Sequence, residues 1–197
     1  MATTNPKLPK IILASRSPRR AEILDAVGWS HEIIVAGVDE TLRAGERPLD
    51  YVQRLALAKA EAVAAKVEQG LVLGADTTVV VDDQILGQPT DSDDARRMLM
   101  LLNGKWHEVL TGVALVCAGG TQRQVSHEIT RVRFAELTDD EIEWYVSTRE
   151  PMDKAGAYGV QGKAALLIEE IHGDYFNVVG LPIRLVYEMA TRIDGTA

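Results

Sequence analysis

Asp76 is the residue of this chain whose type and position point most directly to chemistry. It lies inside the apolar run Leu71–Val81, which is typical of a buried central strand. A carboxylate there costs free energy unless it binds a cation or ends the buried stretch. The alternative is a structural aspartate bonded to backbone amides at a strand bend. The preceding Gly74 would allow a ligand or another backbone to approach closely.

Lys59 is a second charged residue in an apolar setting. It stands three residues after Ala56 and four before Val63, so on a helix it falls within an apolar stripe. A lysine in that position must extend its amine into water, pair with an anion or face a cleft. The sequence leaves these three possibilities open. The stripe consists of Val52, Leu55, Ala56, Ala60 and Val63.

The segment Ser15–Arg20 is a candidate anion site. Ser17 followed by Pro18 is typical of a helix start, with proline at the first helical position. Free N–H groups at a helix N-terminus bind anions, and arginine side chains match phosphate oxygens. Arginines in a first turn oppose the usual preference for acidic residues, which a bound anion would explain. Solvated arginines are the alternative, and the sequence contains no Walker motif.

Asp153–Gly162 is a glycine-rich loop with three glycines at three-residue spacing. This pattern lets a backbone approach a ligand, but it is not the dinucleotide-binding fingerprint, and by itself it favours a structural turn. The sequence has no zinc-hydrolase or serine-hydrolase motif. The histidines lack metal-ligand spacing and are expected to be structural or exposed; they are His31, His107, His127 and His172.

These residues need strands and helices to position them. Strands and helices alternate early in the chain and hairpins follow later, which predicts a mixed α/β sheet in a single domain over residues 1–197, with residues 1–9 disordered or loosely attached. The expected strands are 10–14, 31–36, 71–81, 85–86, 106–117, 122–134, 165–171 and 175–179, the last two as a hairpin, and the expected helices are 18–27, 50–69, 92–102, 138–148 and 185–193.

Composition and charge exclude several classes of protein. Of the 197 residues, 46% are hydrophobic and 25% charged, which is typical of a globular domain. The net charge of -8 argues against a nucleic-acid-binding protein, which needs a basic face. No apolar run is long enough to cross a membrane, and the N-terminus lacks a signal-peptide core. Cys117 is the only cysteine; it is expected to be a small core residue and fits a reducing, cytoplasmic compartment.

Several segments together resemble the signature sequences of the Maf family of nucleotide pyrophosphatases. The resemblance extends from about Ile11 to Ile193. It implies a mixed, twisted α/β sheet with flanking helices and two lobes around a deep cleft, similar to inosine-triphosphate pyrophosphatases. It also implies hydrolysis of a nucleoside triphosphate to monophosphate and pyrophosphate by a homodimer that uses Mg²⁺ or Mn²⁺. The matching segments are Ala14–Arg20, Leu73–Thr77, Gly87–Asp91, Asp153–Gly162 and Val179–Pro182.

The same resemblance assigns roles to individual residues. Asp76 would be the general base and a metal ligand, and Glu40 the second acidic group and metal ligand. Lys59 would bind phosphate beside them, which fits a metal shared by carboxylates while one carboxylate takes the proton of water. The phosphate chain would be held by Ser15, Arg19 and Arg20.

Substrate choice follows from a smaller set of residues. Thr77, Arg19 and Gln161 resemble the branch of the family that acts on dTTP and UTP. A carboxamide has a donor and an acceptor, which suits the N3–H and carbonyl edge of thymine or uracil. The other main branch prefers 7-methylguanosine triphosphate and differs at these positions.

Gln88 departs from the family pattern, which has lysine before Pro89. The absence of this lysine removes a cation that is expected to face the triphosphate, although glutamine still donates hydrogen bonds. We expect weaker activity, or substitution by another residue such as Lys154. Gln88 also favours the main alternative, a nucleotide-binding regulator of cell division with little or no turnover. A third possibility, nucleic-acid binding through the arginine cluster, predicts salt-dependent affinity for DNA.

Overall fold

The computed structural model describes residues 8–35 and 37–194, which group into two compact units. Among these described residues, unit 1 is formed by residues 8–35, 37–76, 111–128 and 180–194, and unit 2 by Thr77–Leu110 and Ile129–Val179. Each unit therefore combines segments that are distant in the sequence. The predicted loose segment 1–9 lies, up to residue 7, outside the described residues.

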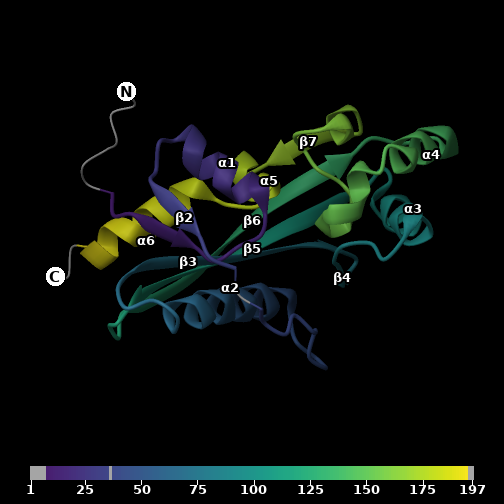
Figure 1. Ribbon diagram of the computed structural model, residues 1–197. Coiled ribbons are helices and arrows are strands. Elements are labelled where there is room, and N and C mark those ends of the chain that lie inside the picture. The colour runs from purple at the N-terminus through teal and green to yellow at the C-terminus, as the bar shows by residue number, and fades with distance from the viewer. Residues whose placement is uncertain (1–7, 36, 195–197) are drawn as a thin grey trace. The chain divides into compact units, whose positions relative to one another are not determined.

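A seven-stranded sheet runs through the fold. In chain order the strands are β1 (Ile11–Leu13), β2 (His31–Ile33), β3 (Gly70–Val81), β4 (Gln84–Leu86), β5 (Trp106–Ala118), β6 (Arg123–Phe134) and β7 (Ile168–His172). Their order in the sheet is β2-β1-β3-β5-β6-β7, with β4 paired to β3. β1 pairs in parallel with both β2 and β3, whereas the pairs β3–β4 and β6–β7 are antiparallel. The two kinds of pairing confirm the predicted mixed α/β sheet (Figure 1).

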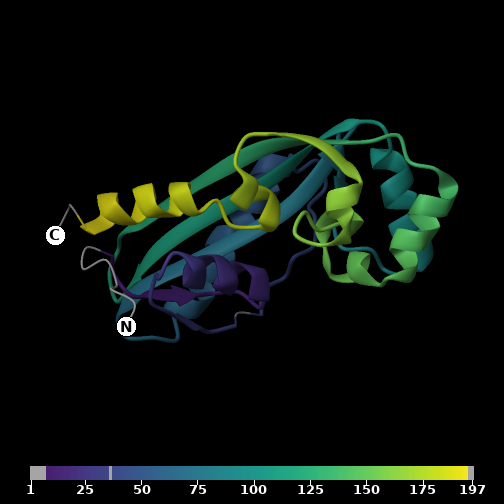
Figure 2. The same ribbon diagram turned by 90° about the horizontal axis from the view of Figure 1, so that it is seen from above.

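Three helices flank the strands in unit 1. α2 (Pro48–Ala64) lies on one face of the sheet, and α1 (Pro18–Ala26) and α6 (Ile183–Asp194) lie on the other (Figures 1 and 2). The apolar stripe predicted for α2 is confirmed, because its members are buried against the sheet. The cluster around it contains Ile12, Ala14, Ala56, Ala60, Val63, Val72, Ala114 and Val116.

Two strand glycines allow α2 to approach the sheet closely. A Cβ atom on Gly74 would lie 2.1 Å from the carbonyl oxygen of Ala56, and one on Gly112 would lie 2.2 Å from that of Val52. Both distances are far below van der Waals contact, so only glycine fits at either position. The close approach suggested by Gly74 is therefore that of another backbone.

Unit 2 contains two capped helices, α3 (Ser92–Leu102) and α4 (Asp139–Ser147). The Asp91 side chain accepts a hydrogen bond from the backbone N–H of Asp94 at 2.8 Å. Thr138 and Glu141 form a reciprocal capping box at the start of α4. Both helix starts match the predictions from the sequence. Three short 3₁₀ helices and one α-helix complete the unit: η1 (Glu150–Asp153), η2 (Ala155–Ala157), η3 (Lys163–Leu166) and α5 (Tyr175–Val179).

A histidine lies within the aromatic part of the unit 2 core. His107 is 2% exposed, and its Nε2 is 2.7 Å from the Tyr158 hydroxyl. The rings of His107, Phe134 and Tyr158 meet edge to face, with centroids 4.9–5.3 Å apart. His107 is thus a structural residue, as predicted.

The predicted hairpin near the C-terminus is wrong. Tyr175–Val179 is helix α5, where the backbone N–H of Phe176 bonds to the Asp174 carboxylate at 2.7 Å. The buried Asn177 side chain donates to the Val109 carbonyl at 2.9 Å. These tertiary and capping bonds override the strand preference of aromatic and β-branched residues. The strand expected at 165–171 is instead the end of η3 followed by β7.

Other element bounds differ less. β2 is shorter than the predicted 31–36, and α2 begins at Pro48 and ends at Ala64 instead of spanning 50–69. Cys117 is half-buried near the end of β5 and accordingly is not a core residue.

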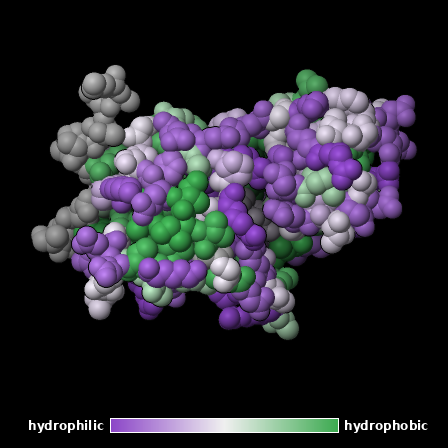
Figure 3. All heavy atoms as spheres, viewed as in Figure 1, coloured by the Kyte–Doolittle hydropathy of each residue, from purple (hydrophilic) through white to green (hydrophobic). Residues whose placement is uncertain are grey.

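The face of the molecule seen in Figure 3 is mainly polar over the described residues. The face seen in Figure 1 also carries an apolar area between β2 and α2, in unit 1 (Figure 3). Among the helices that the structure describes, none is long and apolar enough to cross a membrane.

Candidate active site

The turn between β1 and α1 positions Ser15 and Arg20 in unit 1. Both are buried, at 7% and 8% exposure. The Ser15 hydroxyl oxygen accepts hydrogen bonds from the backbone N–H of Ser17 and from Arg20, each at 3.1 Å. Because those bonds use the oxygen as an acceptor, the hydroxyl hydrogen can be donated to a ligand.

The Arg20 side chain is directed into unit 1. It donates to the carbonyl oxygens of Gly180 at 2.8 Å and Ala75 at 2.9 Å. Burial lowers the pKa of its guanidinium, and the charge of Asp76 opposes that effect. Arg20 therefore fixes the backbone next to Asp76 in addition to any role in anion binding. Arg19 is half-buried and Arg16 exposed on the same turn.

Lys59 brings two carboxylates together. Its amine is 2.6 Å from Asp76 Oδ1 on β3 and 2.9 Å from Glu40 Oε1. The side chains of Lys59 and Asp76 are only 12% and 11% exposed, whereas that of Glu40 is 49% exposed. Of the three possibilities for a lysine in the apolar stripe, the structure shows pairing with anions. The cation that Asp76 contacts is this ammonium group.

Residues of α2 hold the loop that carries Glu40. The Tyr51 hydroxyl donates to the Glu40 carbonyl at 3.0 Å. Arg54 donates to the Thr41 carbonyl at 3.1 Å and forms an ion pair with Glu46 at 2.5 Å. Lys59 is on the same helix, so α2 positions both the cation and the more exposed of its two carboxylate partners.

Burial dominates the electrostatics of Asp76. It raises the pKa of the carboxyl group, and the nearby positive charges of Lys59 and Arg20 oppose this effect without cancelling it. A carboxylate with a raised pKa is a better proton acceptor than an exposed aspartate. The carboxylate of Asp76 can therefore accept a proton close to the turn that carries Ser15 and Arg20.

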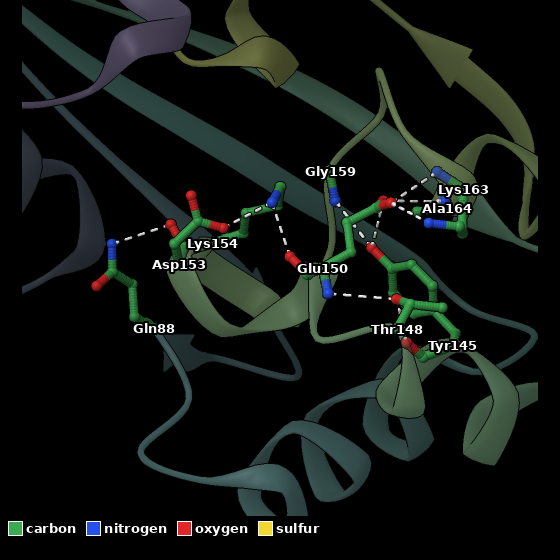
Figure 4. Close-up of polar contacts among 9 residues, drawn as sticks. All are labelled: Gln88, Tyr145, Thr148, Glu150, Asp153, Lys154, Gly159, Lys163 and Ala164. Atoms are coloured by element: carbon green, nitrogen blue, oxygen red, sulfur yellow. Dashed lines mark hydrogen bonds and ion pairs between the residues drawn. The ribbon is translucent and has the colours of Figure 1, made fainter.

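The remaining predicted residues belong to unit 2. Thr77 follows Asp76 on β3. Gln88 donates to the Asp153 carbonyl at 3.1 Å (Figure 4). The Lys154 amine bonds to the Glu150 carbonyl at 2.7 Å and to the Asp153 carboxylate at 2.6 Å. Gln161 is exposed, and its side chain makes no hydrogen bond to another residue that the structure describes.

The structure thus brings part of the predicted site together. Ser15, Arg20, Glu40, Lys59 and Asp76 form one connected group in unit 1 through the contacts given above. Thr77, Gln88 and Gln161 are in unit 2, and Arg19 lies on the same turn as Arg20. The functional roles of all these residues stay predictions. Sequence reasoning missed Tyr51, Arg54 and Glu46, which hold the Glu40 loop.

Comparison with known proteins decides the family. Residues 10–193 match the family described as Maf-like protein. This chain belongs to the Maf family. The resemblance seen in the sequence motifs is therefore confirmed over nearly the whole chain.

Similar Maf proteins share about half of their residues with this one. A dTTP/UTP pyrophosphatase of Symbiobacterium thermophilum is 52% identical over 185 residues, covering 94% of each chain. One of Acetivibrio thermocellus is 53% identical, covering 88% of this Maf chain and 90% of the relative. Among solved structures, the Staphylococcus aureus Ham1 protein aligns with a TM-score of 0.53 at 13% identity, covering 95% of this chain and 100% of Ham1. That likeness supports the fold alone.

Proposed function

We propose that this chain hydrolyses dTTP and UTP to the nucleoside monophosphate and pyrophosphate. The observation that carries the proposal is the Lys59 amine in contact with both Asp76 and Glu40. This group lies in unit 1 together with the anion-binding turn that contains Ser15. The names of the similar Maf proteins support the choice of substrate.

The residues divide the reaction between them. Asp76 takes the proton of the attacking water, whose oxygen forms the new bond to phosphorus as the anhydride bond between the α and β phosphates breaks. Lys59 orients the two carboxylates and offers positive charge to the phosphates. Ser15 and Arg19 hold the phosphate chain, and Arg20 fixes the turn while contributing charge. Pyrophosphate leaves as the second product.

The residues fit a divalent cation. Mg²⁺ in phosphate-transfer sites is held by one or two carboxylates together with substrate phosphates and water. Asp76 and Glu40 already converge on one positive group, Lys59. Among the described residues no cluster of three or more acidic, histidine or cysteine side chains exists, so the phosphates would supply the remaining ligands. When bound, Mg²⁺ or Mn²⁺ neutralises phosphate oxygens and makes a coordinated water more acidic.

Base selection is proposed for Thr77, Arg19 and Gln161. The exposed carboxamide of Gln161 can pair with the N3–H and carbonyl edge of thymine or uracil. Such pairing would discriminate against 7-methylguanosine triphosphate, which presents a different edge. On the resemblance to the Maf family we also propose a homodimer in the cytoplasm; sedimentation of the purified protein tests the oligomeric state.

The direct test is a panel of triphosphates with and without a chelator. We expect pyrophosphate release from dTTP and UTP in the presence of Mg²⁺ or Mn²⁺, and much less from 7-methylguanosine triphosphate. Asp76→Asn should reduce the rate by about a hundredfold to ten-thousandfold, because it removes the proton acceptor. Full activity of Asp76→Asn would contradict the mechanism. Gln88 favours the alternative of a nucleotide-binding regulator, which predicts nucleotide binding without pyrophosphate release.

A further inference from the structure

Glu150, the first residue of η1 in unit 2, accepts hydrogen bonds from several groups at once. Its side chain is 16% exposed. Oε2 accepts from the backbone N–H of Lys163 at 3.0 Å, and Oε1 accepts from that of Ala164 at 3.4 Å and from the Tyr145 hydroxyl at 3.0 Å. Figure 4 shows these groups converging on one carboxylate. A carboxylate enclosed by donors in this way is a strong acceptor that fixes the backbone around it.

The same network reaches the other side of Gln161. The Tyr145 hydroxyl accepts a hydrogen bond from the backbone N–H of Gly159 at 3.3 Å, while it donates to Glu150. The backbone before Gln161 is therefore held at Gly159, through Tyr145. The backbone after Gln161 is held at Lys163 and Ala164, which bond to Glu150 directly. Tyr145 itself is fully buried, so the network is anchored in the core of unit 2.

Glycine at position 162 makes the contact possible. A Cβ atom there would lie 2.2 Å from Oε1 and 2.7 Å from Oε2 of Glu150. The carboxylate thus lies directly against the backbone of the residue that follows Gln161. The amine of Lys154 further holds the Glu150 backbone by its bond to the carbonyl oxygen.

The Gln161 side chain differs from its surroundings. The backbone on both sides is tied to Glu150, yet the carboxamide is exposed and bonds to no other described side chain or backbone group. A side chain with free donors and acceptors on a fixed backbone is suited to recognising a ligand, because little conformational freedom of the loop is lost on binding.

We propose that Glu150 is a positioning residue that sets the place of Gln161 and thereby the choice of nucleobase. The proposal rests on the proposed function, in which Gln161 pairs with the edge of a pyrimidine. Glu150 does not touch substrate in this scheme. It acts on selectivity between bases more than on the chemical step at the phosphates.

Two variants break the contact from opposite sides. Glu150→Gln keeps the shape but replaces one acceptor by a donor that faces other donors, and Gly162→Ala pushes the carboxylate away while leaving its charge. We expect both to reduce the ratio of kcat/KM for dTTP to kcat/KM for dATP by on the order of tenfold to a hundredfold, as a misplacement of about 1 Å can do. Glu169→Gln is the matched control, an exposed glutamate on β7 of the same unit. It should keep the wild-type ratio.

A double-mutant cycle shows whether Glu150 acts through Gln161. In a Gln161→Ala background, Glu150→Gln should change the dTTP-to-dATP ratio less than twofold. A wild-type ratio in both Glu150→Gln and Gly162→Ala, or equal losses for both nucleotides, would overturn the proposal. If neither variant folds, Tyr145→Phe removes one hydroxyl from the network and should lower the dTTP-to-dATP ratio severalfold. An unchanged ratio in Tyr145→Phe would also contradict the proposal.

A failure of the proposed hydrolysis can be distinguished from a failure of the positioning role of Glu150. If the wild-type protein releases no pyrophosphate from dTTP or UTP, the function itself is wrong, whatever Glu150 does. Hydrogen exchange without nucleotide then still tests the positioning role. The amides of Gly159, Lys163 and Ala164 should exchange at least about tenfold faster in Glu150→Gln than in the wild type, and equal rates would contradict it.

Discussion

Acidification should destabilise this protein through one buried imidazole. Burial lowers the pKa of His107 from an ordinary value of 6.5 to about 4. Its Nδ1 is buried without a hydrogen-bond partner in the part of the chain that the structure describes. The nearby Lys105 backbone raises the pKa, but less than burial lowers it. The folded protein therefore holds His107 neutral over a pH range in which the unfolded chain is protonated.

The sign and size of the effect follow from that difference. Between pH 6.5 and about 4 the unfolded state binds a proton that the folded state does not, so the free energy of unfolding falls as the pH falls. At 1.36 kcal/mol per pH unit the full loss is about 3 kcal/mol. About 2 kcal/mol of it should be lost between pH 8 and pH 5.

Urea unfolding followed by circular dichroism at several pH values between 5 and 8 measures the loss. His107→Gln cannot be protonated but can still bond to the Tyr158 hydroxyl. We expect this variant to be less stable at pH 8 and to lose about 2 kcal/mol less than the wild type on going to pH 5. The control His172→Gln replaces a histidine whose side chain is 57% exposed and whose Nε2 is 2.5 Å from Glu170 Oε1. A His107→Gln variant with the same pH dependence as the wild type would refute the reasoning.

Three further substitutions test other parts of the structure. Gly74→Ala would place a methyl group 2.1 Å from a carbonyl oxygen of α2, so the free energy of unfolding should fall by about 3 kcal/mol or more in urea titrations; a loss below 1 kcal/mol would disprove the tight contact. Thr138→Ala removes the capping box with Glu141 and should cost about 1 kcal/mol in the same assay, with no change in hydrolysis. Gln88→Lys restores a cation where the side chain now donates to the Asp153 carbonyl, and we expect kcat/KM for dTTP to rise about tenfold; unchanged kinetics would mean that position 88 does not contribute.

The sequence predicted those parts of the fold in which local and tertiary preferences agree. The apolar run at 71–81 is strand β3, and the capping residues Asp91 and Thr138 start helices where expected. Helix α5 was missed because its sequence favours a strand. Two interactions stabilise the helix. The Asp174 carboxylate caps its first turn locally, and the buried Asn177 side chain bonds to Val109, which is distant in the sequence.

The candidate site divides in a similar way. Lys59 and Asp76 could be found without any comparison, because charges in apolar patterns are expensive and need an explanation. Glu40 lies in a polar loop where a carboxylate is unremarkable, so only the resemblance to the Maf family singled it out. Glu150 gave no signal at all, because its partners are mostly backbone N–H groups, which a sequence does not distinguish.

The contact between Glu150 and Gly162 restricts how this loop can change during evolution. Any larger residue at 162 must displace the carboxylate, and a residue without a carboxylate at 150 loses an acceptor for at least one of two backbone N–H groups. A substitution at either position alone gives a protein in which the loop backbone has lost hydrogen bonds. The two positions should therefore be inherited together, even though twelve positions separate them in the sequence.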